Sequence, residues 1–153
     1  ATTVGACTGA VAGLVAITPA AGSVDLVGAL CIGVITSAIC FWMVAFVKPK
    51  FGYDDALDAF GVHGVGGILG SVLTGVFATQ FVTGEGGVEG ALYGDWHQLW
   101  IQVLATLISI VFSAVMTFIL FKVTDKLVGI RVDKRVEEEG LDIYEHGESA
   151  YDL

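Results

Sequence analysis

The chain has 153 residues, of which 55% are hydrophobic and 15% are charged, and its formal net charge is −9. Soluble globular domains are about 45–50% apolar and about 25% charged, so this composition, with a mean hydropathy of +0.79, excludes an ordinary soluble domain and indicates a membrane protein. The acidic residues lie in connections and in the C-terminal region. The negative charge therefore belongs to solvated ends, and we expect no nucleic-acid partner.

Four apolar segments follow one another along the chain. A membrane-spanning helix needs about 20 apolar residues, and in lipid every backbone polar group must be satisfied within a helix or a closed barrel. The alternation of apolar and polar residues that marks a barrel strand is absent. We therefore predict an all-α transmembrane helix bundle over residues 1–129. Its helices are expected at about 2–18, 26–47, 59–79 and 96–128.

The first segment is short and opens the chain without a methionine, so we expect further sequence before it. Positive charge gives the orientation of the helices, because loops rich in Lys and Arg stay in the cytoplasm. All seven Lys and Arg lie in the connection 48–58 or at and beyond the end of the fourth segment. The connections 19–25 and 80–95 have none. We predict a multi-pass protein of the cell membrane with residues 130–153 as a cytoplasmic C-terminal tail.

His63 is the one ionisable residue within the third apolar segment, and glycines surround it. An ionisable side chain at membrane depth is costly unless it faces a partner or a cavity, so by default it indicates a transport path. Neutral imidazole offers one donor and one acceptor, which suits a small polar solute such as ammonia and permits proton transfer. The other interpretation is a histidine that hydrogen-bonds to a neighbouring helix. The residues alone do not decide between these two interpretations of His63.

The residues flanking His63 have simpler interpretations. Carboxylates just before a helix can cap its free N–H groups and complement its dipole, and we predict this role for Asp55 and Asp58; cation binding is the alternative. Small residues let helices approach closely, so Gly64 and Gly67 are predicted to serve packing along the same helix.

An enzyme is not expected, because the chain shows no nucleophile with an adjacent base and no cofactor-binding loop. Its three cysteines have no metal-ligand spacing. We therefore expect no catalytic residue, no cofactor and no metal site.

Three stretches, in order along the chain, resemble one known family. The motif Gly13-Leu-Val-Ala-Ile-Thr-Pro-Ala-Ala-Gly22 resembles the end of the eighth helix of the Amt/Mep ammonium transporters. The motif Asp54-Asp-Ala-Leu-Asp-Ala-Phe-Gly-Val-His63-Gly-Val-Gly-Gly resembles the opening of the tenth. Gly140-Leu-Asp142, followed by Glu145-His-Gly-Glu-Ser-Ala-Tyr151, resembles the C-terminal tail of the family.

The resemblance implies an ammonium transporter with an inverted-repeat, eleven-helix fold, assembled as a homotrimer in the lipid bilayer. Ammonium would be deprotonated and ammonia conducted through a hydrophobic pore lined by two histidines, of which His63 matches the second. Asp55 matches a carboxylate with a counterpart in the first half. The tail would regulate activity, with a PII-type signalling protein as a cytoplasmic partner. The residues of this chain that match the tail of the family are Gly140, Asp142, His146, Gly147, Glu148 and Tyr151.

Only the C-terminal portion of such a transporter is matched. Inverted-repeat transporters place their path between the two halves, so this chain is expected to need the missing N-terminal helices. The alternative is a non-transporting assembly or regulatory membrane module that binds a signalling protein. A generic water or gas channel is a third reading.

Overall fold

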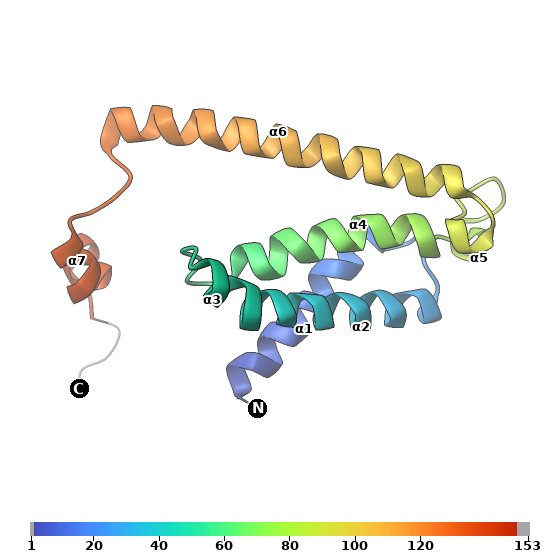
Figure 1. The fold of residues 1–153 in the computed structure, drawn as a ribbon, viewed down its shortest axis with the longest axis horizontal. Coiled ribbons are helices and arrows are strands. Elements are labelled where there is room, and N and C mark those ends of the chain that lie inside the picture. Colours follow the sequence, from blue (N-terminus) through green and yellow to red (C-terminus); the bar gives the residue numbers. More distant parts are fainter. Residues whose placement is uncertain (1, 150–153) are drawn as a thin grey trace. The chain divides into compact units, whose positions relative to one another are not determined.

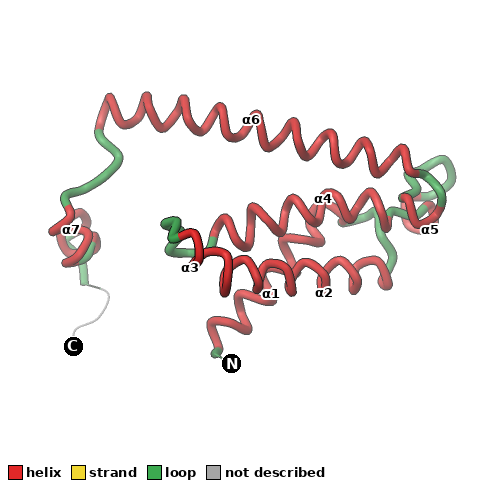
Figure 2. Tube along the Cα trace, viewed as in Figure 1, coloured by secondary structure: helices red, strands yellow, loops and turns green. Residues whose placement is uncertain are grey.

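The computed structural model describes residues 2–149, and the regular elements in this range are helices (Figure 2). Within this range, four helical stretches are long and apolar enough to cross a membrane. The prediction of an all-helical membrane protein is therefore confirmed. The four stretches are Thr3–Ala20, Leu26–Phe51, Phe60–Phe77 and Trp96–Val128.

Short turns of other helix types extend the α-helices in three of these stretches. The α-helices are labelled in Figure 1. The first joins α1 (Thr3–Ile17) to a 3₁₀ turn, η1 (Thr18–Ala20). The second joins α2 (Leu26–Trp42), a π-helical turn, η2 (Met43–Val47), and α3 (Lys48–Phe51). The third joins another π-helical turn, η3 (Phe60–Gly64), to α4 (Val65–Phe77). The fourth is α6 (Trp96–Val128).

The C-terminal ends of the second and third helices differ from the sequence prediction. The second helix continues beyond residue 47, because Pro49 falls in the first turn of α3, where a missing N–H costs little. It ends at Gly52, whose φ of 63° gives the left-handed conformation common after helices. The third helix ends at Phe77 rather than residue 79, because Ala78 is extended (ψ 140°) and forms an antiparallel bridge with Val24.

The core of the first compact unit, Ala1–Ser109, is formed by α1, α2 and α4. One buried cluster contains Ala12, Cys40 and Val62. A second contains Ala16, Ala20 and Ile32, with Leu73 and Phe77 packed against it. Between the two clusters the residue numbers rise in α1 and α4 and fall in α2. The α2 helix therefore runs antiparallel to the other two.

Glycines bring helix backbones into direct contact in this unit. A Cβ at Gly70 would overlap the backbone carbonyl of Ala16, so α4 can cross α1 here only without a side chain. A Cβ at Gly75 would lie 2.8 Å from the Cα of Leu99, near the start of α6. These are close approaches of the kind that small residues permit in membranes.

One main-chain hydrogen bond joins the two connections at one end of the core, and a second lies within the longer connection. The N–H of Thr79 donates to the carbonyl of Ser23 at 2.9 Å, and the N–H of Gly90 donates to the carbonyl of Ala78 at 2.8 Å. A Cβ at Gly90 would overlap the carbonyl of Val76. The longer of these connections also contains α5 (Gln80–Thr83) and η4 (Ala91–Tyr93).

The second unit, Ile110–Leu153, contains the later part of α6, then α7 (Lys134–Glu139) and a π-helical turn, η5 (Asp142–His146). Exposed ion pairs surround α7: Arg131–Glu137 at 3.0 Å, Lys134–Glu138 at 3.7 Å and Arg135–Glu139 at 2.7 Å. Exposed pairs of this kind contribute little stability, because water screens both charges.

Candidate functional site

His63 lies in the π-helical turn η3 and is exposed in this chain. The turn is wider than an α-helical one, since the N–H of Val65 reaches back to the carbonyl of Phe60. Turns of this type occur often at functional sites. Among residues 2–149 the imidazole has no hydrogen-bond partner, so both ring nitrogens are open to a solute.

A hollow of about 340 Å³ lies between η3 and α1, and His63 is part of its wall. The other lining residues are mostly apolar or weakly polar: Thr3, Val4, Cys7, Thr8, Val11, Leu57 and Val62. The hydroxyl of Thr8 already donates to the carbonyl of Val4 at 2.9 Å. An imidazole on such a wall can exchange one hydrogen bond as donor and one as acceptor with a small polar molecule.

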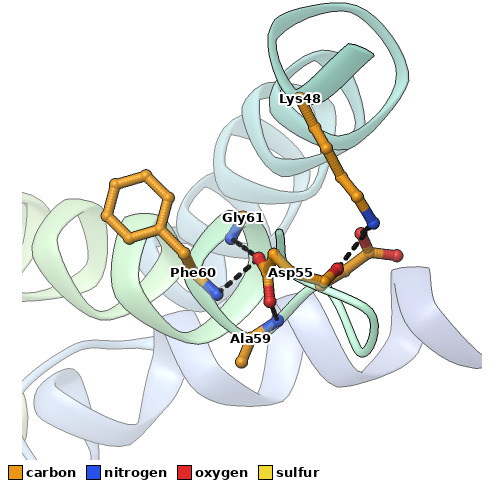
Figure 3. Close-up of polar contacts among 6 residues, drawn as sticks. Lys48, Asp55, Ala59, Phe60 and Gly61 are labelled. Carbon is orange, nitrogen blue, oxygen red and sulfur yellow. Dashed lines mark hydrogen bonds and ion pairs between the residues drawn. The ribbon is translucent and has the colours of Figure 1, made fainter. Parts of the chain in front are cut away.

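The carboxylate of Asp55 caps the start of the helix that carries His63 (Figure 3). Its Oδ1 accepts the N–H of Ala59 at 2.8 Å, and its Oδ2 accepts those of Phe60 at 2.9 Å and Gly61 at 3.4 Å. These N–H groups lie in the first turn, where no earlier helical carbonyl is available. Asp55 therefore fixes the backbone on the N-terminal side of His63.

Asp58 has a different role from the predicted cap. Its Oδ1 accepts a hydrogen bond from Lys48 Nζ at 2.6 Å. The same ammonium donates to the backbone carbonyl of Asp55, also at 2.6 Å; Figure 3 labels Lys48 and Asp55. Asp58 has a φ of 54°, a conformation that Asp and Asn tolerate better than most residues. The capping prediction for Asp58 is thus replaced by an ion pair, and Lys48 is a residue that the sequence argument missed.

The predicted packing glycines do not make the close contacts within this chain. No heavy atom lies within 4 Å of a Cβ built at Gly67, and a Cβ at Gly64 would meet only the ring of Phe60, at 3.1 Å. The glycines that pack against α1 are Gly66, whose Cβ would lie 3.2 Å from a methyl of Val15, and Gly70. Within the described chain, the helix face that packs against α1 is therefore the one that carries Gly66 and Gly70.

In the second unit, Tyr144 and Glu139 form a hydrogen bond in which the tyrosine hydroxyl donates. Arg135 Nε donates to the other carboxylate oxygen at 2.7 Å. The Tyr144 bond first, and Arg135 second, hold the pKa of Glu139 below its usual 4.5. The same bond to a carboxylate raises the pKa of Tyr144 above its usual 10.0.

The predicted tail residues form one compact backbone turn. The N–H of Glu148 donates to the carbonyl of Asp142 at 3.0 Å, spanning His146 and Gly147. Gly140 and Gly147 have φ values of 109° and 65°, which glycine adopts without strain. Tyr151 lies outside the described residues.

A sequence-family comparison covers nearly the whole chain: residues 1–151 match the model of the Ammonium Transporter Family. The chain is 54% identical over 152 residues to an ammonium transporter of Aquifex aeolicus, covering 99% of this chain and 35% of the relative. It is 48% identical over 150 residues to an ammonium transporter of Bacillus subtilis, covering 98% of this chain and 37% of the relative. The chain thus spans about a third of the length of the curated relatives that it matches.

The fold agrees with solved structures. The crystal structure of Saccharomyces cerevisiae Mep2 matches with a TM-score of 0.78 and 37% sequence identity, over 88% of this chain and 31% of that one. Candida albicans Mep2 matches with the same TM-score at 35% identity, over 88% of this chain and 30% of that one.

Proposed function

Because the chain belongs to the ammonium transporter family, we propose that it supplies the His63 wall of a path along which ammonia crosses the membrane. The observation that carries this proposal is the exposed imidazole beside the hollow on α1. The carboxylates nearest to it in sequence are engaged elsewhere: Asp55 with backbone amides and Asp58 with Lys48. His63 therefore offers a basic nitrogen to a solute on this wall.

The chemistry of the hollow favours neutral ammonia over ammonium. An apolar wall cannot replace the hydration of a cation, whereas a neutral molecule loses much less on entering. Ammonium that gives up a proton becomes ammonia, which can donate to one nitrogen of a neutral imidazole. In the proposed step the released proton passes to the unprotonated nitrogen of the imidazole, which then donates from both nitrogens, so ammonia accepts rather than donates at that stage.

One wall does not enclose a path, and His63 is exposed within this chain. We propose that further helices of an inverted-repeat, eleven-helix fold face α1 and η3 and close the conduction path. Family membership also supports a homotrimer in the cell membrane with a cytoplasmic C-terminal tail, regulated by a PII-type signalling protein. The relatives are named as transporters, so the proposed activity is transport rather than catalysis.

The test uses a chimera in which residues 1–153 replace the matching C-terminal portion of the Aquifex aeolicus relative, purified and placed in liposomes. Ammonium and potassium transport are measured for the unmodified chimera and for His63→Ala. The matched control is His97→Ala, which alters an exposed histidine outside the hollow. We expect His63→Ala to lower ammonium transport or its preference over potassium, and His97→Ala to leave both unchanged.

Unchanged transport and selectivity in His63→Ala would contradict the pore role. An unmodified chimera that assembles but transports nothing would favour a non-transporting assembly or regulatory module. Equal permeation of water and ammonia with no discrimination would favour a generic channel.

A further inference from the structure

Besides the cap formed by Asp55, a second contact holds the turn that carries His63, on the side of the turn that packs against α2. The thiol of Cys40 donates to the carbonyl of Val62, with a sulfur–oxygen distance of 3.8 Å. Both residues are buried, at 2% and 3% exposure. We propose that Cys40 is a positioning residue for His63, because its thiol holds the peptide group that links Val62 to His63. This inference rests on the proposed function of His63.

The π-helical geometry explains why this carbonyl benefits from an outside donor. The backbone hydrogen bonds of η3 do not follow the α-helical pattern, in which each N–H bonds to the carbonyl four residues earlier. The N–H of Val65 is instead shared between the carbonyls of Phe60 and Val62. Such turns are rare and depend on their surroundings for stability. A buried donor on a neighbouring helix restricts how far the Val62 carbonyl can rotate.

The sulfur has little freedom to move away from this position. Cys40 belongs to the buried cluster with Ala12 and Val62. A Cβ at Gly66 would lie 3.6 Å from the Cys40 sulfur, an ordinary van der Waals distance, so the sulfur packs close to the backbone of α4. Burial among apolar groups leaves the thiol few alternative acceptors, which favours its bond to the carbonyl.

The peptide plane shared by Val62 and His63 transmits this constraint to the ring. Rotation of the Val62 carbonyl rotates the N–H of His63 with it and changes the direction of the side chain. Asp55 holds the amides of Phe60 and Gly61 just before this peptide. The two contacts together restrict the backbone on both sides of the residue that faces the hollow.

The test compares Cys40→Ala, Cys40→Val and Cys40→Ser in the same chimera, with Cys31→Ala as the control. Cys31 lies on the same helix, is half-buried and donates no hydrogen bond among the described residues. The measured quantity is the ratio of ammonium to potassium transport. This ratio does not depend on how many molecules are folded, so loss of stability alone leaves it unchanged.

We expect Cys40→Ala and Cys40→Val to change the ratio by roughly two- to fivefold, the effect of losing one weak S–H hydrogen bond. Cys40→Ser, which keeps a donor, should stay closer to the unmodified ratio, and Cys31→Ala should match it. Cys40→Val retains side-chain volume and remains informative if the smaller alanine prevents assembly.

Three results would overturn the inference. The ratio in Cys40→Ala and Cys40→Val could equal that of the unmodified chimera while His63→Ala changes it; the proposed function would then survive alone. Cys40→Ser could behave as Cys40→Val does, which would exclude the hydrogen bond as the cause. If His63→Ala also leaves the ratio unchanged, the proposed function and this inference are both wrong.

Discussion

Gly70 and Ala16 mark the crossing of α4 and α1, where the two backbones touch with no side chain between them. We expect Gly70→Ala to destabilise the helix bundle by about 1–3 kcal/mol, because an added methyl group in a filled site forces the helices apart. Thermal unfolding of the purified chimera, followed by the loss of assembled protein, measures the effect. The control is Gly33→Ala, since no heavy atom of the described chain lies within 4 Å of that Cβ. Equal stability of the two variants would contradict the close crossing.

The cap formed by Asp55 gives a second prediction. Asp55→Ala should destabilise the start of the third helix by about 1–2 kcal/mol, because amides in its first turn lose their acceptor. Asp55→Asn keeps one acceptor oxygen and should recover part of the loss. Asp54→Ala is the matched control, because Asp54 is exposed and has no hydrogen-bond or ion-pair partner among the described residues. Hydrogen exchange of the amides of Ala59 and Phe60 would report the change directly, and equal exchange in all three variants would exclude capping.

The pair formed by Lys48 and Asp58 is partly shielded from solvent, with side-chain exposures of 28% and 27%. A double-mutant cycle with Lys48→Met and Asp58→Asn should give a favourable coupling free energy. Asn at position 58 tolerates the positive φ, so the cycle isolates the ion pair. The same cycle with Lys50→Met, which changes an exposed lysine nearby, should give a coupling close to zero. Equal couplings in the two cycles would show that the contact contributes nothing specific.

The bond between Tyr144 and Glu139 predicts how the tail depends on pH. The pKa of Glu139 is lowered, so the stabilisation is present above 4.5 and is lost as pH falls through the lower pKa of the folded state. The pKa of Tyr144 is raised, so the stabilisation is present below 10.0 and is lost as pH rises through the higher folded value. The bond should therefore be intact throughout the neutral range.

Ultraviolet absorbance measures this prediction, because tyrosinate absorbs differently from tyrosine. The difference between unmodified protein and Tyr144→Phe isolates the titration of Tyr144, whose midpoint should lie above 10.0. Glu139→Gln removes the carboxylate that accepts the bond and should bring the midpoint back towards 10.0. A midpoint that is the same with and without Glu139 would contradict the bond.

Much of the fold follows from the sequence, because hydropathy and segment length are enough to predict membrane helices. The long apolar run from Trp96 to Val128 predicts one helix, and the structure forms α6 over the same residues. The ends of the other helices depend on main-chain geometry that hydropathy does not contain. The wide turn η2 before Pro49 and the bridge between Val24 and Ala78 are two examples.

The site was predicted less completely. The third helix carries several glycines, and their presence alone does not say which face meets α1. In the structure Gly66 and Gly70 meet α1, rather than Gly67. The pairing of Lys48 with Asp58 was also beyond sequence reasoning, because it depends on a loop that folds back through a residue with positive φ.

The link between the two connections at one end of the core consists of main-chain atoms, from Thr79 to Ser23, and a second main-chain bond, from Gly90 to Ala78, closes the longer connection on itself. Such a link does not depend on side-chain identity, so Ser23 and Ala78 can change as acceptors without loss of the bonds. Proline at position 79 or 90 would remove a donor, and any side chain at Gly90 would overlap Val76. These main-chain bonds therefore limit sequence change sharply at positions 79 and 90, and burial limits the size of the side chain at position 78, where Ala78 is 1% exposed.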